Sequence, residues 1–288
     1  THHIAQMISA PSVIAEVGAE MDETIDRTYP QDESTAPKLH ESMEDLVSRV
    51  KHDGSPVHST TNGYLQALNI SGLIQLAHEH DVVIELCYRP GDYLLAGSTA
   101  SKVWPSEHND KELTNKILRC MALGNRRTPV QDIRFAFNQL AEIAVRAMSP
   151  ALNDPFTALD CINRIGAGIG RMAQRNDPPA YRIDSDKQLR LIISPVSFTE
   201  LVENAFTPVR NYSRGSVIVT LQMLRTISEL APLLRNDTQR RALVQQATLI
   251  HRGAEEGLVD AHDRKTAQDA HQHVLDRLGL KASDLASG

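Results

Sequence analysis

Two consecutive helices are specified by the stretch from residue 128 to residue 155, TPVQDIRFAFNQLAEIAVRAMSPALNDP. Thr128, Pro129 and Gln131 match the N-cap, N1 and N3 positions of a capping box, which predicts that the first helix begins at Pro129. Its apolar side should be formed by Ile133, Phe137, Leu140, Ala144 and Ala147. This spacing of three or four residues is typical of one buried helix face.

The first helix should end near Ser149-Pro150, because the residue before a proline resists the α conformation. Asp154 and Pro155 then open a second helix, with the aspartate as cap and the proline in the first turn. Leu159, Ile162, Gly166, Ile169 and Ala173 line one side of that helix. So short a connection predicts an antiparallel helix hairpin.

Outward from this hairpin, the sequence predicts an α+β fold in three parts. Residues 1–53 form N-terminal helices and a linker, with a helix over 4–27 that Pro11 kinks or restarts and a short helix over 41–50. Residues 54–105 form a small β-rich subdomain, with strands at 57–61, 64–69, 82–88, 93–96 and 100–104 and a helix over 70–80. Residues 106–288 form a mainly helical subdomain with one β-hairpin (181–184 and 189–193) and helices over 197–212, 217–230, 238–258 and 260–278.

Composition excludes some classes of protein. The formal net charge is −6 and aromatic residues make up 4% of the chain, which disfavours a nucleic-acid partner. Cys87, Cys120 and Cys161 are the three cysteines, and no CxxC pair occurs, so a reducing compartment fits better than a disulfide framework. No run of residues is apolar and long enough to span a bilayer. The chain does not begin with Met, and we expect it to be part of a longer protein.

The densest polar cluster supplies the candidate ligand-binding residues: Arg126, Arg127, Gln131, Asp132, Arg146, Ser149, Asn153 and Asp154. Arg126 and Arg127 precede a predicted helix N-terminus, where guanidinium and backbone N–H donors together suit a small anion. The alternative is an Arg/Asp ion network that joins the helices to the β-rich subdomain. We predict neither a catalytic residue nor a cofactor from this pattern.

Two further motifs favour structural interpretations. Gly166-Ala167-Gly168-Ile169-Gly170 has Arg171 where a dinucleotide fingerprint needs glycine, and it lies in a helix, so close helix packing explains it better. His78 and His80 are two residues apart on a predicted helix and diverge, so we predict no metal site from them. A metal site could still form here only if a third ligand came from a distant part of the sequence.

The residues also carry a resemblance to a family. Gly124-Asn125-Arg126-Arg127-Thr128 and the run Ala144-Val145-Arg146-Ala147-Met148-Ser149-Pro150-Ala151-Leu152-Asn153-Asp154-Pro155 resemble the signature of the predicted bacterial membrane proteins catalogued as domain of unknown function 2254. His2-His3-Ile4-Ala5 resembles the segment after the last membrane helix of that family, and residues 64–104 resemble its middle region.

The resemblance implies that membrane-spanning helices, absent from this chain, are its partner in the parent protein. It places the parent in the cell inner membrane and, with an even number of spans, this portion in the cytoplasm. A second resemblance, of residues 88–97 to barrel-sandwich folds of the biotinyl and lipoyl kind, implies a barrel-sandwich-like subdomain. The nearby Lys102 lies within a strand rather than at a hairpin tip, which disfavours a carrier role.

Three functions follow as hypotheses. The first is a non-enzymatic ligand-sensing or assembly domain that regulates a channel- or transporter-like membrane part. The second is a hydrolase that uses Asp132 or Asp154 beside an arginine anion clamp. The third is a structural oligomerisation domain, a homo-oligomer whose interface includes an exposed apolar stripe over residues 4–25.

Overall fold

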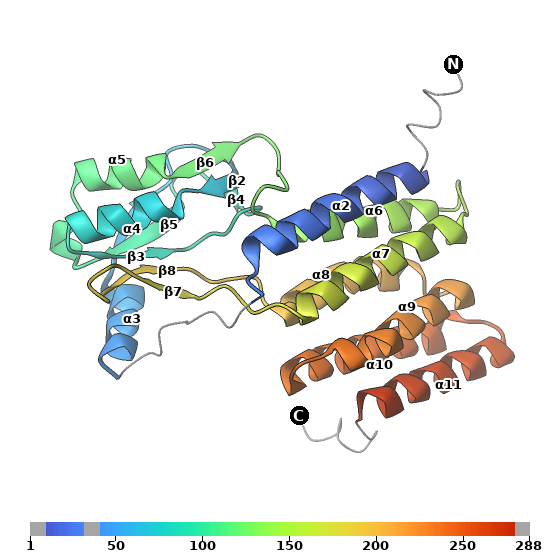
Figure 1. The fold of residues 1–288 in the computed structure, drawn as a ribbon. Coiled ribbons are helices and arrows are strands. Elements are labelled where there is room, and N and C mark those ends of the chain that lie inside the picture. Colours follow the sequence, from blue (N-terminus) through green and yellow to red (C-terminus); the bar gives the residue numbers. More distant parts are fainter. Residues whose placement is uncertain (1–9, 32–40, 280–288) are drawn as a thin grey trace. The chain divides into compact units, whose positions relative to one another are not determined.

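The computed structural model describes residues 10–31 and 41–279, which fall into two compact units (Figure 1). The helical unit contains the described residues of 1–31, 136–176 and 196–288, and the mixed unit contains those of 32–135 and 177–195. The α+β class predicted from sequence is confirmed. The three-part division at residues 53 and 105 stays a prediction.

The helical unit consists of helices, several of which begin at a residue whose side chain caps the first turn. They are α2 (Ala10–Thr28), most of α6 (Ile133–Ala147), α7 (Pro155–Ala173), α8 (Phe198–Tyr212), α9 (Val217–Leu230), the 3-10 helix η2 (Ala231–Leu233), α10 (Asp237–Gly257) and α11 (Ala261–Leu278). Asp154, Ser197 and Asp260 each accept a hydrogen bond from a backbone N–H in the first turn of their helix. Gly279 ends α11 with a left-handed φ of +72°, a conformation that glycine adopts without strain.

Helix α2 buries its apolar stripe inside this unit, against α7. Ile14, Val17, Met21 and Ile25 are at most 6% exposed. Asp26 on its outer side forms ion pairs with Arg171 and Arg175. The expectation that this stripe is exposed is therefore wrong for residues 10–28, because α7 covers it, while self-association of the chain stays a prediction. The part of the predicted helix before Ala10 lies outside the described residues.

The glycines of α7 allow close approach of its neighbours, as the sequence predicted. A Cβ on Gly166 would lie 2.3 Å from Thr226 Cγ2 of α9, and one on Gly170 would lie 3.2 Å from Leu230 Cδ2 of the same helix. Gly168 faces the second turn of α6, where a Cβ would lie 2.8 Å from Phe137 Cζ. Phe137 near the start of α6 therefore lies against the C-terminal half of α7, and this contact favours the predicted antiparallel course of the two helices.

The described residues of the mixed unit form two sheets and four helical segments, in addition to the first three residues of α6. The larger sheet has the order β1 (Ser55–His58), β5 (Thr99–Trp104), β3 (Val83–Leu86), β8 (Leu189–Ile192), β7 (Tyr181–Ile183), and the smaller has the order β4 (Tyr93–Leu94), β2 (Gly63–Leu68), β6 (Met121–Gly124). The helical segments are α3 (Glu41–Asp53), α4 (Ile70–Glu79), η1 (Ser106–His108) and α5 (Lys111–Arg119). Fully buried Leu65, Leu73, Ile84 and Leu113 belong to one apolar core cluster that links strands with helices α4 and α5.

The predicted strands are present, but their partners come from distant parts of the chain. The hairpin β7–β8 is confirmed, and β8 pairs in parallel with β3 through Ile84 and Leu191. Strand β6, which pairs with β2, falls in a region that we predicted to be helical. Four residues are too few for a periodic pattern to distinguish a strand from a helix end. The described strands form two open sheets and no closed barrel.

A stacked histidine pair joins α10 and α11, which lie side by side (Figure 1). The rings of His251 and His271 have centroids 4.6 Å apart and planes 5° apart. Burial, and then the neighbouring His251, lower the pKa of His271 from 6.5 to about 4, opposed by Glu255. The folded chain therefore holds His271 neutral at pH values where the unfolded chain protonates it.

We expect the stability of the chain to fall between pH 6.5 and pH 4 in part because of His271. In that range the unfolded state binds more protons than the folded state, so the free energy of unfolding drops as the pH falls, by at most about 1.4 kcal/mol per pH unit for one group. His271→Phe keeps a ring at this position without a titrating group and should reduce the slope, as measured by urea unfolding across this range. The control is His262→Gln, because His262 is exposed, and this variant should keep the slope of the unchanged chain. Equal slopes for His271→Phe and His262→Gln would contradict the assignment to His271.

Candidate functional site

The arginine-rich cluster of the mixed unit is organised around one buried carboxylate, Asp132. Its side chain is 1% exposed, and its Oδ2 atom lies 2.8 Å from Arg127 Nε and 2.6 Å from Arg127 Nη2. Arg134 approaches from the first turn of α6, with Nε 3.6 Å from Asp132 Oδ1. Arg127 also lies over the ring of Phe135, 5.7 Å from its centroid. The carboxylate is therefore neutralised by two arginines of its own chain.

The loop after β3 completes this cluster. Arg134 Nη2 donates to Asp92 Oδ1 at 2.7 Å and to the backbone oxygen of Pro90 at 3.0 Å. Gly91 has a φ of +94°, and a Cβ at this position would lie 2.1 Å from Asp132 Oδ2. Only glycine lets the backbone come this close to the carboxylate.

Burial is the largest influence on the ionisation of Asp132. It raises the pKa of this carboxyl above its ordinary value, while Arg127 and Arg134 oppose the rise. A buried charge of this kind needs its partners, because removal of one partner leaves an uncompensated charge away from water. The geometry thus matches the alternative of an ion network that joins the start of α6 to the β-rich segment.

The predicted capping box at residues 128–131 is wrong. Helix α6 begins at Ile133, and Asp132 caps it by accepting a hydrogen bond from the backbone N–H of Arg134 at 3.1 Å. The Gln131 amide instead bonds both backbone groups of Leu68 in β2, accepting from N at 2.9 Å and donating to O at 3.2 Å. The buried Thr128 hydroxyl has no hydrogen-bond partner among the described residues. The long-range pairing of Gln131 with the strand prevails over the local motif.

The eight candidate residues are divided between the two units. Arg126, Arg127, Gln131 and Asp132 belong to the mixed unit, and Arg146, Ser149, Asn153 and Asp154 belong to the helical unit. The Arg126 side chain is exposed, and its backbone oxygen accepts a hydrogen bond from Gln66 at 2.7 Å. The ligand-binding role of these residues stays a prediction.

The four candidates in the helical unit shape the turn between α6 and α7. The exposed Arg146 pairs with Glu142 one turn earlier, and the backbone oxygen of Ser149 accepts from Asn153 N at 2.8 Å. Asn153 has a left-handed φ of +45°. Asp154 caps α7 through the Thr157 hydroxyl at 2.6 Å and the Thr157 backbone N–H at 3.2 Å, and these bonds lower the pKa of Asp154. Each of these contacts serves the turn itself.

A surface that sequence reasoning missed lies beside this turn. An open groove of about 470 Å³ runs between the start of α2 and the α6–α7 turn, lined by Ala10, Val13, Ile143, Arg146, Ala147, Leu152, Asp154 and Thr157. Leu152 is 65% exposed, and Phe156 in the first turn of α7 is 68% exposed. The sequence offered one signal for this surface: large apolar side chains stand between a proline-containing turn and a helix start, where residues are usually polar.

The fold and these sites define the class of the protein. It is a two-unit α+β chain in which Arg127 and Arg134 neutralise the buried Asp132, and it has a mostly apolar groove beside α2. In the described residues, no helix is both long and apolar enough to cross a membrane. The chain belongs to the family described as predicted membrane protein (DUF2254), whose model matches residues 1–229.

Relatives of the chain are similar over most of its length. An uncharacterized protein of Mycobacterium bovis and one of Mycobacterium tuberculosis are each 28% identical to it over 268 residues, which is 91% of this chain and 50% of the relative. The chain thus spans about half the length of the curated relatives it matches. No solved structure matches it.

Proposed function

We propose that this chain is a non-enzymatic domain that lies outside the bilayer on the cytoplasmic side, docks on the membrane-spanning part of the same protein, and regulates that part. Family membership supports the link to a membrane protein. The free cysteines, Cys87, Cys120 and Cys161, suit a reducing compartment. Self-association of the chain and an anionic ligand at Arg126 and Arg127 stay predictions.

The observation that carries the docking proposal is the groove lined in part by Leu152, together with the exposed Phe156 in the adjacent first turn of α7. Large exposed apolar side chains at one turn are typical of a contact surface rather than of a solvated loop. The groove wall formed by Ala10 and Val13 belongs to the first described helix, and the mostly apolar lining fits an apolar helical segment. The occupant we propose is such a segment from the membrane-spanning part of the same protein.

Release of the domain from vesicles tests this proposal. A protease site inserted ahead of Ala10 in the full-length protein should be cut in inside-out but not right-side-out membrane vesicles. After cutting, the wild-type domain should remain bound to the vesicles, while Leu152→Asp with Phe156→Asp should shift most of it into the supernatant. The substitutions place charges in an apolar contact, which such contacts do not tolerate.

Val259→Asp is the matched control, because Val259 is 95% exposed on the same unit and away from the groove lining. It should leave the domain bound. Immediate release of the wild-type domain would refute docking, and cleavage only in right-side-out vesicles would refute the cytoplasmic orientation.

A further inference from the structure

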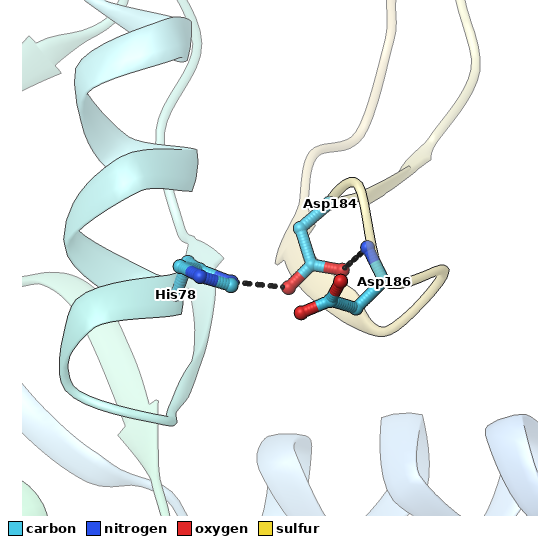
Figure 2. Close-up of side chains that lie close together, drawn as sticks. All are labelled: His78, Asp184 and Asp186. Atoms are coloured by element: carbon cyan, nitrogen blue, oxygen red, sulfur yellow. Dashed lines mark hydrogen bonds and ion pairs between the residues drawn. The ribbon is translucent and has the colours of Figure 1, made fainter.

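A second cluster of chemistry-bearing side chains lies in the mixed unit, remote in sequence from the residues discussed above. His78 stands in the last turn of α4, Asp184 follows β7, and Asp186 lies in the turn to β8 (Figure 2). One nitrogen or carboxylate oxygen from each of them lies within 4.8 Å of the others. His78 Nδ1 is 2.8 Å from Asp184 Oδ2, across 106 positions of sequence.

Asp184 is a rigidly held carboxylate. Its Oδ1 atom accepts from the backbone N–H groups of Asp186 and Gln188, both at 2.9 Å, and its Oδ2 atom accepts from Arg190 Nε at 2.6 Å. The side chain is only 4% exposed. Burial alone raises the pKa of Asp184, but the hydrogen bonds from Arg190 and His78 outweigh it and hold that pKa well below the usual range. The carboxylate is thus charged and preoriented toward His78.

The other two side chains are accessible and can adjust. The His78 side chain is 45% exposed, and Asp186 is exposed in the turn. Arg190 also pairs with Asp81, with Nη1 2.8 Å from Oδ1. Arg190 thus pairs with two carboxylates, Asp81 and Asp184, and the Asp186 carboxylate beside His78 and Asp184 adds a further negative charge to the cluster.

We propose that His78, Asp184 and Asp186 bind a divalent transition-metal ion, which takes the place of the hydrogen between His78 Nδ1 and Asp184 Oδ2. One imidazole and two carboxylates are ligands that zinc and its neighbours accept, and they leave a fourth position for water. Neighbouring ligand atoms around a tetrahedral zinc lie roughly 3.3 Å apart, given bonds of about 2.0–2.2 Å. The exposed His78 ring needs to move by only roughly half an ångström from Asp184 to reach that spacing.

Arg190 and the two backbone N–H groups have a role in this site as well. They occupy the remaining lone pairs of Asp184, so they orient the ligand as hydrogen-bonded outer partners commonly do. Bound metal would join α4 to the β7–β8 hairpin, segments that the fold brings together from distant parts of the sequence. Because the ion competes with protons for the imidazole, its affinity should decrease at acidic pH.

Calorimetric titration with Zn²⁺ on the full chain tests this site. His2 and His3 are replaced by Gln in every sample so that they contribute no ligands. We expect one ion per chain, and at least about a tenfold loss of affinity in His78→Gln and in Asp186→Asn, because each removes one of three protein ligands. His80→Gln, two positions along the chain from His78, should bind as the parent does.

Folding and metal geometry are checked in the same samples. His78 and Asp186 are exposed, so their variants should keep the circular dichroism spectrum of the parent. Co²⁺ in place of Zn²⁺ should give the visible absorption of a four-coordinate site in the parent and in His80→Gln but not in the other two. Absence of binding by the parent at about 0.1 mM Zn²⁺, where a site with a Kd of about 1 μM would be nearly saturated, would overturn the proposal. Equal affinity of all four proteins would overturn it as well.

Discussion

Arg127→Ala should lower the free energy of unfolding of the chain by about 3 kcal/mol. The Asp132 side chain is 1% exposed and loses its closest partner in this variant, while Arg134 Nε stays 3.6 Å away. A buried charge left without its partner is among the most destabilising changes a single substitution makes. Urea unfolding followed by circular dichroism measures the difference.

Arg126→Ala is the matched control for that experiment, because the neighbouring Arg126 side chain is exposed. It should change stability by no more than about 0.5 kcal/mol. Adding Asp132→Asn to Arg127→Ala removes the unpaired charge and should restore part of the loss, which a double-mutant cycle quantifies. Equal stability of Arg127→Ala and Arg126→Ala would contradict the structural role of the Arg127–Asp132 pair and favour a ligand role for both arginines.

Gly166→Val should also destabilise the chain, by about 3 kcal/mol. Helix α7 approaches α9 at Gly166 so closely that a Cβ would lie 2.3 Å from Thr226 Cγ2, and valine adds two further methyl groups. Thr226 is itself buried, so neither side chain can move into solvent. The measurement is again the free energy of unfolding in urea.

Ala167→Val provides the comparison, since Ala167 is the next residue of α7 and is exposed. It should cost no more than about 0.7 kcal/mol, the helix-propensity difference between the two residues. Thr226→Ser removes the nearest atom and should recover part of the loss in the Gly166→Val background. Equal losses at positions 166 and 167 would contradict close packing as the reason for this glycine.

The candidate site was predicted only in part. Composition and spacing identified Arg127 and Asp132 as members of one cluster. Sequence proximity was enough for this prediction, because the two residues are only five positions apart. The contribution of Asp92 and Pro90 was not visible in sequence, because their loop reaches Arg134 from more than 40 positions away. Arg146 to Asp154 were grouped with them only by proximity in sequence, and they belong to the other unit.

The amino-acid sequence by itself determined the features that depend on neighbours within a few residues. Asp154 before Pro155, Ser197, and Asp260 with Gly279 mark helix ends through hydrogen bonds inside one turn, and the α7 glycines mark a helix face. The tertiary structure decided the pairings over long sequence separations. It joined β8 to β3, directed Gln131 to Leu68 instead of to a helix cap, and brought His78 to Asp184. The physical reason is that a hydrogen bond or ion pair has the same chemistry whether its partner is 3 or 106 residues away, and only the folded backbone selects between them.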